Sequence, residues 1–283
     1  MNASANKTFV VGDEFELIKS ATDYALTRTQ DGWISGFFYR CELTSVFQPI
    51  YSITQDKTMG HAAYIRSKSN DGGALWPWQV FALASKDEQL VDLDRLCRAI
   101  HALNYYFNDT SKSDHLFVEV HPRLLESVQD DHGGAFENLL DLIGVKTSRV
   151  VIEIPSILNR NWKLLQHVIM NYRSRGYQIA ANYSGTRSDW MIELGSLYPD
   201  IVRIEISDLM RHQAIAPLVD TIHGFGASLL ARDIESPEQL AFARRINADY
   251  LQGNLLGKPA ARLIFPGHTI DSGAEGRTRR ESH

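Results

Sequence analysis

The chain has 283 residues, 44% of them hydrophobic, and this length suits one large core such as a single α/β barrel of roughly 250 residues. The formal charge is −5, from 29 Lys and Arg against 34 Asp and Glu, so no overall positive field attracts a polyanion and direct nucleic-acid binding is not expected. No stretch approaches the ~20 apolar residues that span a bilayer. The N-terminus lacks the basic region and apolar run of a signal peptide, and Cys41 and Cys97 form no CxxC pair. We therefore expect a cytoplasmic protein with no membrane-spanning segment.

Residues 1–40 predict a helical and aromatic extension before the main domain. Asp13 followed by Glu16 is a variant of the helix-start signal, and apolar residues then recur at helical spacing as far as Ala25. Two glycines in 31–36 end that pattern, and an aromatic run at 37–39 leads into the first strand-like stretch. We place the domain boundary near residue 40.

Short β-like runs then alternate with amphipathic, helix-length segments, which is typical of a parallel sheet or a barrel. With this many strands, closure into a barrel is favoured over an open sheet. We expect the barrel domain over 41–265, and the polar, Gly-containing segment 266–283 is predicted to be a disordered tail. The β-like runs are 46–53, 62–66, 116–120, 150–154, 178–182, 201–206, 228–231 and 250–252.

Three motifs stand in a fixed order along this domain. Phe47-Gln-Pro-Ile50 resembles the Y-Q-P-I opening of EAL domains, and Gly60-His-Ala-Ala-Tyr-Ile-Arg66 resembles their G-x-E-A-L-x-R segment. Gln252-Gly-Asn-Leu-Leu-Gly-Lys-Pro259 resembles their Q-G-Y-L-F-G-K-P close. Further matches in register lie between them, at 151–153 and 230–239. The resemblance covers about 220 residues, and it implies an α/β fold, an EAL-type, TIM-like (β/α)8 barrel.

The resemblance also implies a metal-dependent site that this chain has lost. Active EAL domains hydrolyse cyclic di-GMP with two divalent ions, which oxygen ligands hold at the C-terminal mouth of the barrel. That ligand set carries a net negative charge, whereas the matching set here sums to zero. We therefore expect no catalytic residue, no metal and no cofactor, and hence a chain that is not an enzyme. The matching positions, of which only Glu153 keeps the family's residue, are Ala62, Glu119, Glu153, Asn182, Tyr183, Arg203 and Arg232.

The two arginines of this set suggest how the site is stabilised without metals. We expect Arg203 and Arg232 to pair with Glu119 and Glu153, since buried carboxylates need a partner. The alternative is that each arginine is a solvent-facing residue with no special partner. Tyr183 is expected to project into the site.

Three functions are compatible with these substitutions. The first is a non-catalytic regulator that binds another protein, as the resemblance implies for degenerate members. Its contact surface would be the aromatic segment of Trp33, Ile34, Phe37 and Phe38, whose alternative role is to pack under the barrel. The other option is the Tyr183–Trp190 loop, which the family uses to form dimers, so a homodimer stays open.

The second function is a receptor that binds cyclic di-GMP without cleaving it. Gln48, Arg66, Gln252 and Pro259 resemble the nucleotide-contacting set of the family, although strand-end hydrogen bonding is an alternative role for the two glutamines.

The third function is an enzyme of different chemistry, because carboxylates near a histidine can carry out acid–base steps. The residues available for it are Glu119, Glu153, His121, Glu205 and Asp233.

Overall fold

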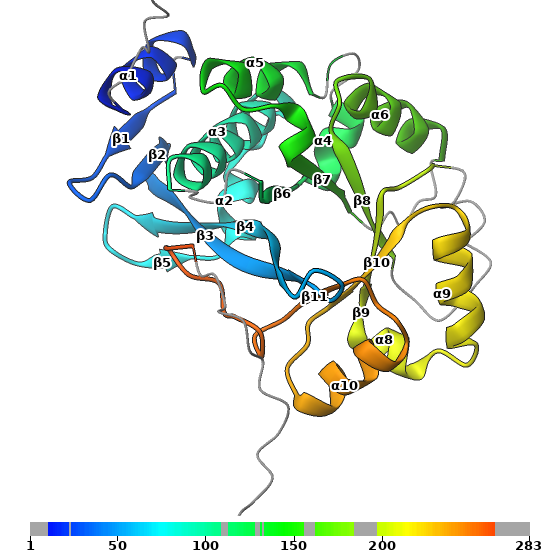
Figure 1. The fold of residues 1–283 in the computed structure, drawn as a ribbon. Helices are drawn as coiled ribbons and strands as arrows, with labels where there is room; N and C mark the ends of the chain where they lie inside the picture. The colour runs from blue at the N-terminus through cyan, green and yellow to red at the C-terminus, as the bar shows by residue number, and fades with distance from the viewer. Residues whose placement is uncertain are drawn as a thin grey trace, which may run out of the picture.

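The computed structural model describes residues 11–22, 24–108, 113–127, 131, 133–155, 162–183 and 197–263. Eight of its strands close into a barrel in the order β3-β11-β10-β9-β8-β7-β6-β4, and β4 pairs back onto β3 (Figure 1). Each contains or overlaps one of the eight runs predicted above, so the α/β barrel is confirmed. The strands are β3 (Cys41–Ser52), β4 (Lys57–Ser69), β6 (His115–Glu119), β7 (Val150–Ile154), β8 (Gln178–Tyr183), β9 (Ile201–Glu205), β10 (Ser228–Arg232) and β11 (Tyr250–Gln252).

The first strand departs from a strictly parallel (β/α)8 barrel. β3 runs antiparallel to both of its barrel neighbours, β4 and β11, whereas the other adjacent pairs of the barrel are parallel. Only residues 53–56 connect β3 to β4, which is enough for a hairpin but far too short for the crossover that parallel neighbours require.

The N-terminal extension adds strands to this sheet. Helix α1 (Val11–Thr22) is followed by β1 (Leu26–Arg28) and β2 (Ile34–Phe38), and β2 pairs antiparallel with the first residues of β3. The helix therefore ends before Ala25, to which the helical spacing extended. At the other side of the ribbon, the short strand β5 (Ala74–Leu75) pairs with β4.

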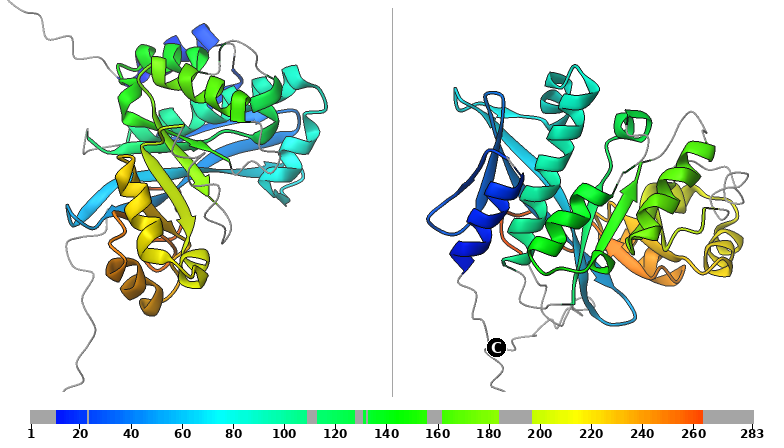
Figure 2. Two further views of the ribbon diagram at one scale, coloured as in Figure 1. Left: turned by 90° about the vertical axis from the view of Figure 1, so that its right-hand side faces the viewer. Right: turned by 90° about the horizontal axis from the view of Figure 1, so that it is seen from above.

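The helices lie around the outside of the strands (Figures 1 and 2). Alternation along each strand produces two packed layers, as expected for strands whose neighbouring side chains point to opposite faces. The outer layer joins strands and helices, and the inner layer fills the barrel with apolar side chains that range from alanine to phenylalanine: Ile50, Ala62, Phe117, Val151, Ala180, Ile201 and Leu230. The helices are α2 (Pro77–Leu83), α3 (Asp87–Tyr106), α4 (Pro122–Ser127), α5 (Gly134–Leu142), the 3-10 helix Thr147–Arg149, α6 (Trp162–Ser174), α8 (Ile206–Arg211), α9 (Ile215–Gly224) and α10 (Pro237–Arg245).

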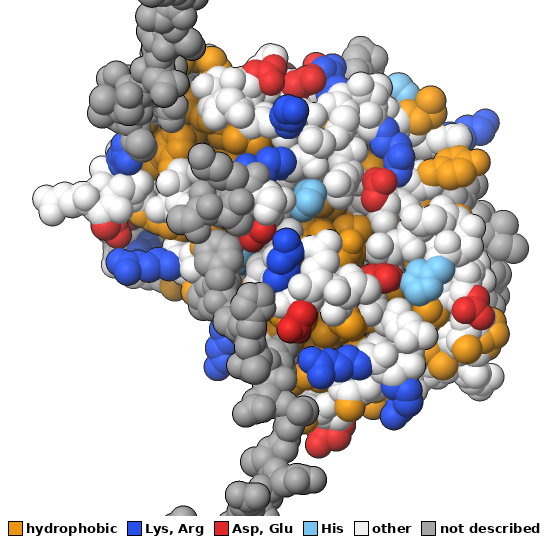
Figure 3. All heavy atoms as spheres, viewed as in Figure 1, with side chains coloured by type: hydrophobic (Ala, Val, Ile, Leu, Met, Phe, Trp, Pro, Cys, Tyr) orange, Lys and Arg blue, Asp and Glu red, His pale blue; other side chains and the backbone are white. Residues whose placement is uncertain are grey.

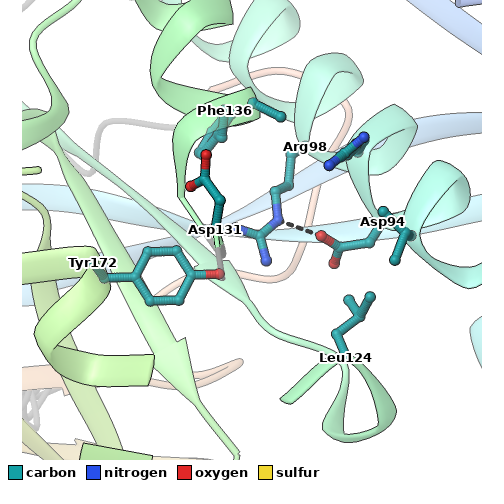
Figure 4. Close-up of a pocket in the computed structure, with 9 residues that line it drawn as sticks. Asp94, Arg98, Leu124, Asp131, Phe136 and Tyr172 are labelled. Atoms are coloured by element: carbon teal, nitrogen blue, oxygen red, sulfur yellow. Dashed lines mark ion pairs between the residues drawn. The ribbon is translucent and has the colours of Figure 1, made fainter. Parts of the chain in front are cut away.

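The outer layer contains a buried ion pair on α3. Arg98 Nε lies 2.6 Å from Asp94 Oδ2, and the guanidinium sits 5.7 Å and 5.8 Å from the ring centroids of Phe136 and Tyr172. Asp94, Tyr172 and Phe136 surround Arg98 in a small cavity (Figure 4). Burial raises the pKa of Asp94, and the positive charge of Arg98 opposes part of that rise. The pair is thus a structural element of the helical layer, outside the barrel.

No helix in the described part of the chain is long and apolar enough to cross a lipid bilayer. On the face drawn in Figure 3, Lys and Arg side chains are interspersed with Asp and Glu, so this face carries no large field of one sign.

Candidate functional site

The candidate site is the mouth of the barrel at the carboxyl ends of its parallel strands. Inward-facing positions alternate along each strand, so the residue two places after an inner-layer residue also points inward, nearer the mouth. Phe117, Val151, Ala180, Ile201 and Leu230 belong to the inner layer. The positions that follow them toward the mouth are Glu119, Glu153, Asn182, Arg203 and Arg232, all of them in the predicted site.

A buried ion pair occupies the centre of the mouth. Arg203 Nη1 contacts Glu153 Oε2, and the two side chains are 3% and 4% exposed. Arg203 Nη2 also donates a hydrogen bond of 3.0 Å to Gln252 Oε1. Burial acts to lower the pKa of Arg203, but the nearby Glu153, Tyr64 and Glu119 together outweigh that effect, so the pKa is raised overall. The predicted pairing of Arg203 with Glu153 is therefore present.

Gln252 links this ion pair to two further side chains. Its Nε2 donates to Gln48 Oε1 at 3.0 Å and lies 2.9 Å from Tyr64 Oη. Gln48 in turn donates from Nε2 to the carbonyl oxygen of Gly257 at 3.1 Å. Burial, reinforced by the negative charge of Glu153, raises the pKa of Tyr64 to about 12. Gln48, Tyr64 and Gln252 thus form one hydrogen-bonded network that continues from the Arg203–Glu153 pair.

Arg232 has a different partner from the one expected. Its Nη2 lies 2.7 Å from Glu205 Oε1, and its Nε lies 3.8 Å from Asp233 Oδ2. The expected pairing with Glu119 is wrong, because Arg232 ends β10 in register with Glu205 at the end of the adjacent strand β9. Arg232 and Glu205 each lie within one residue of the end of a predicted strand, so the sequence already indicated that they could be neighbours at the mouth.

Glu119 lies at the edge of the mouth without such a partner. Its side chain is exposed, and no ion pair within 4.0 Å joins it to a cation among the described residues. Glu119 is the register partner of Glu153 on β7. Loss of surrounding water and the charge of Glu153 raise the pKa of Glu119, while Arg203 and Arg232 oppose the rise.

The remaining predicted positions differ in their orientation. Ala62 is buried inside the barrel opposite Gln48 of β3. Asn182 follows the inner-layer residue Ala180, and its buried Oδ1 has no hydrogen-bond partner in the part of the chain that the structure describes. Tyr183 belongs instead to the outer hydrophobic layer. The expectation that Tyr183 fills the mouth is wrong, because successive strand residues point to opposite faces.

The four predicted nucleotide-contacting residues do not form one group. Gln48 and Gln252 meet in the network described above, whereas Arg66 is exposed farther along β4 and donates from Nη1 to the carbonyl oxygen of Ile65 at 3.0 Å. Pro259 is half-buried, next to Ala260, which forms a β-bridge with Phe47.

A cavity of about 280 Å³ opens beside the mouth, between β4, β6 and helices α2 and α3. Tyr64, Arg66, Glu119 and His121 line it together with apolar residues. The ring of His121 stacks on Phe81 with their centroids 4.6 Å apart, and burial lowers the pKa of His121. Glu119 and His121 are therefore near each other, as the third function requires, but His121 is held by an apolar ring.

Gly253 is required by close packing. A Cβ at this position would lie 2.1 Å from the carbonyl oxygen of Ile234, and the backbone of Ile234 is hydrogen-bonded to Gln252 at 3.1 Å. Gly253 has no positive φ. The glycine therefore keeps the backbone close enough to hold Gln252 in its network.

The residues of the mouth do not fit a pair of divalent cations. Hard cations take several carboxylate or other oxygen ligands, yet Ala62 offers a methyl group and the carboxylate of Glu153 is bonded to Arg203. A second guanidinium, that of Arg232, stands at the end of β10. Within the described residues, no group of three or more His, Cys, Asp or Glu side chains is arranged to hold a metal ion. The loop at 184–190 and the segment 266–283 lie outside the described residues, so this geometry does not address the predictions made for them.

The sequence is similar to those of known proteins that contain EAL domains. A protein of Bacillus subtilis (strain 168), described as the uncharacterized EAL-domain containing protein YkuI, is 27% identical over 231 residues, which cover 77% of this chain and 55% of the relative. An uncharacterized signaling protein of Caulobacter vibrioides is 25% identical over 236 residues, covering 77% of this chain and 28% of the relative. The chain thus spans about half the length, or less, of these curated relatives.

Solved structures share the fold. The crystal structure of YkuI in complex with its substrate cyclic di-GMP and calcium has a TM-score of 0.64 at 24% identity, covering 78% of this chain and 57% of that one. A cyclic di-GMP-bound standalone EAL protein from Vibrio cholerae O395 has a TM-score of 0.64 at 15% identity, covering 78% of this chain and 94% of that one. The family model described as EAL domain matches residues 32–259, which is most of the sequence and includes all three motifs. The chain belongs to the EAL domain family.

Proposed function

We propose that this chain is a cytoplasmic, non-catalytic EAL protein that regulates signalling by binding another protein and does not hydrolyse cyclic di-GMP. The observation that carries this proposal is the buried contact between Glu153 and Arg203. It uses the one retained family carboxylate of the matching set as the partner of a guanidinium inside the barrel.

The electrostatics of the pair argue against hydrolysis. Metal-assisted hydrolysis needs carboxylates that are free to hold the ions, which polarise the phosphate and generate hydroxide. Releasing Glu153 for that purpose would leave the charge of Arg203 buried beside an incoming divalent cation. Both the uncompensated burial and the like-charge repulsion oppose metal binding. Without ions, the described residues of the mouth lack the metal-bound hydroxide with which such hydrolysis attacks a phosphodiester.

Binding to a protein is then the activity for which the barrel remains suited. The fold is kept, with a packed apolar interior, and Arg203, Glu153, Gln252 and Gln48 are joined by contacts among themselves at the centre of the mouth. Such a barrel presents a rigid outer surface, on which a partner can dock without remodelling it. The N-terminal strands β1 and β2 enlarge that surface beyond the barrel itself.

A receptor for cyclic di-GMP is the second candidate. The cavity of about 280 Å³ beside the mouth supports it, because Arg66 is exposed there and a guanidinium binds phosphate by a bidentate fork. The related barrel of YkuI was crystallised in complex with cyclic di-GMP. Against the receptor stand Gln48 and Gln252, whose amides are engaged with each other and with Tyr64.

Isothermal titration of cyclic di-GMP into the purified protein, with and without magnesium or calcium, separates these functions. The same samples are then analysed for linear product. A regulator that works through protein contacts gives neither heat nor product. Metal-independent binding without product, abolished in Arg66→Ala and retained in the control Arg262→Ala, would establish the receptor instead. Formation of linear product would refute both.

A further inference from the structure

A groove lies on the ribbon that β3 and β4 form where they extend beyond the barrel, and we call it the β5 groove. Its volume is about 880 Å³, and its lining includes Glu42, Thr44, Arg66, Lys68, Leu75 and Trp76. Its lining comes from β2, β3, β4, β5 and the start of α2 together with the residue before it. This volume falls in the range of sites that enclose several side chains or a small ligand.

The groove exists because the ribbon has one covered face and one open face. Leu43 on β3 is fully buried in the outer layer, and a Cβ at Gly36 of β2 would meet Leu96 and Ile100 of α3 within 2.8 Å. Helix α3 thus packs closely against that face. Glu42 and Thr44 alternate with Leu43 and point to the opposite face, which the groove occupies.

The charges in the groove are not balanced. Arg66 and Lys68 are exposed, and neither has a carboxylate within 4.0 Å among the described residues, whereas Arg98, Arg203 and Arg232 each have one. Glu42 stands opposite Lys68 in the strand register and is half-buried. Two cations against one anion leave the groove one unit positive in a chain whose overall charge is −5.

The apolar part of the groove can accept a hydrophobic side chain of a partner. Trp76 is 69% exposed, and Leu75 lies beside it in the lining. Tryptophan and arginine are enriched among the residues that dominate protein interfaces, and the groove presents Trp76 and Arg66. In addition, β5 is the last strand of the sheet, so its outer edge pairs with no other strand in the described part of the chain.

From this combination we propose that the β5 groove binds an acidic peptide segment of a partner protein, which inserts an aromatic or aliphatic side chain beside Trp76. The inference rests on the proposed function, since it identifies the surface through which the regulator meets its partner. The carboxylates of the segment complement Arg66 and Lys68, and complementary charge sets both the orientation and the rate of such an encounter.

Lys68 and Trp76 are the positions that test the groove, because Arg66 also lines the cavity beside the mouth. The chain offers a matched control for each. Trp78 is likewise 69% exposed but lines the cavity beside the mouth and not the groove, so it separates the two sites. Lys57 is an exposed lysine at the opposite end of β4. All four side chains are at the surface, so their replacement leaves the core intact.

The experiment is selection of a random dodecapeptide phage library on the full-length protein, followed by titration of the selected peptides onto variants. The proposal predicts enrichment of peptides that combine Asp or Glu with an aromatic or aliphatic residue. Lys68→Glu and Trp76→Ala weaken their binding about tenfold or more, whereas Lys57→Glu and Trp78→Ala do not. Glu42→Gln strengthens it, because the one anion of the groove is removed.

Any of three outcomes would refute the proposal that the β5 groove binds an acidic peptide. In the first, the library yields no peptide enriched over the Lys68→Glu, Trp76→Ala double variant, and in the second, the selected peptides lack acidic residues. The third outcome is an equal loss of peptide affinity in the control variants. Competition of the selected peptides by cyclic di-GMP alone, with no loss in Trp76→Ala, would assign them to the mouth instead. The phosphodiesterase assay decides the proposed function separately. An inert protein with an empty selection refutes the groove alone, and a hydrolytic protein refutes the proposed function whatever the selection yields.

Discussion

Breaking the Glu153–Arg203 pair from one side is expected to destabilise the fold strongly. The side chains are 3% and 4% exposed, so solvent does not screen the charge that Glu153→Gln would leave on Arg203. Removing one partner of such a buried pair costs about 3–5 kcal/mol. At about 2–4 °C for each kcal/mol in a domain of this size, the midpoint of thermal unfolding falls by roughly 6–20 °C. Arg203→Met is expected to fall in the same range, because it leaves a buried carboxylate.

The double variant distinguishes charge pairing from ordinary packing loss. Glu153→Gln, Arg203→Met combines the two single changes and is expected to be more stable than either of them, because neither buried charge is then left without its partner. Glu205→Gln is the control, because its pair with Arg232 is 29% and 40% exposed and contributes at most about 1 kcal/mol. Circular dichroism followed through thermal and urea unfolding at pH 7 measures all of them. Additive losses in the double variant would refute the reasoning. So would a melting midpoint that millimolar calcium or manganese raises in the wild type and not in Glu153→Gln.

Three further changes test other parts of the structure. Ala62→Glu restores the family's carboxylate at a position that is 1% exposed, and we expect it to lower stability without producing hydrolysis, as product analysis with manganese and a melting curve will show. Burial lowers the pKa of His101 to about 3, so the unfolded chain binds a proton below about pH 6.5 that the folded chain excludes. The stability contributed by the neutral ring is therefore lost as the pH falls from about 6.5 toward 3. Urea unfolding measures the difference in free energy of unfolding between the wild type and His101→Gln. This difference should shrink by about 2 kcal/mol between pH 7 and pH 5. Gly253→Ala places a methyl group against the backbone of Ile234 and is expected to cost about 1–3 kcal/mol, whereas Gly224→Ala, at the end of α9 with nothing within 4 Å of its Cβ, is expected to be neutral or stabilising in the same assay.

The barrel strands could be predicted because their signal is local. Val150–Ile154 and Ile201–Glu205 are short runs rich in β-branched residues, bounded by polar segments, and each appears in the structure as one strand. Closure of the barrel followed from the number of such runs. The antiparallel setting of β3 was not anticipated, although the predicted runs 46–53 and 62–66 leave only residues 54–61 between them, which is too short for the crossover that parallel strands require.

The site residues could be predicted where the alternation of side chains along a strand and the register of neighbouring strands were taken into account. Glu153 and Arg203 lie on the inward face of their strands and were correctly expected to pair. Tyr183 was misjudged because the motif comparison treats two adjacent residues as one site, whereas adjacent strand residues point to opposite sides of the sheet. The partner of Arg232 depends on which strands are neighbours at the mouth, and only the three-dimensional order of β9 and β10 brings Glu205 to it.

Under the proposed function, the guanidinium of Arg203 takes the place of metal ions at the mouth, and this would remove the dependence of the mouth on ion concentration. An ion dissociates, so a metal site is coupled to ion concentration, whereas Arg203 is part of the chain and its contact with Glu153 is always available. The proposed non-catalytic function therefore predicts that the interior keeps one arrangement with or without divalent ions. Arg66 stands where the cavity beside the mouth and the β5 groove meet, because it lines both. A ligand phosphate at the mouth and an acidic segment in the groove would thus compete for one guanidinium, and by linkage each would weaken the other to the same degree. Under the proposed function, that shared residue would make protein binding sensitive to the nucleotide without catalysis or a conformational change.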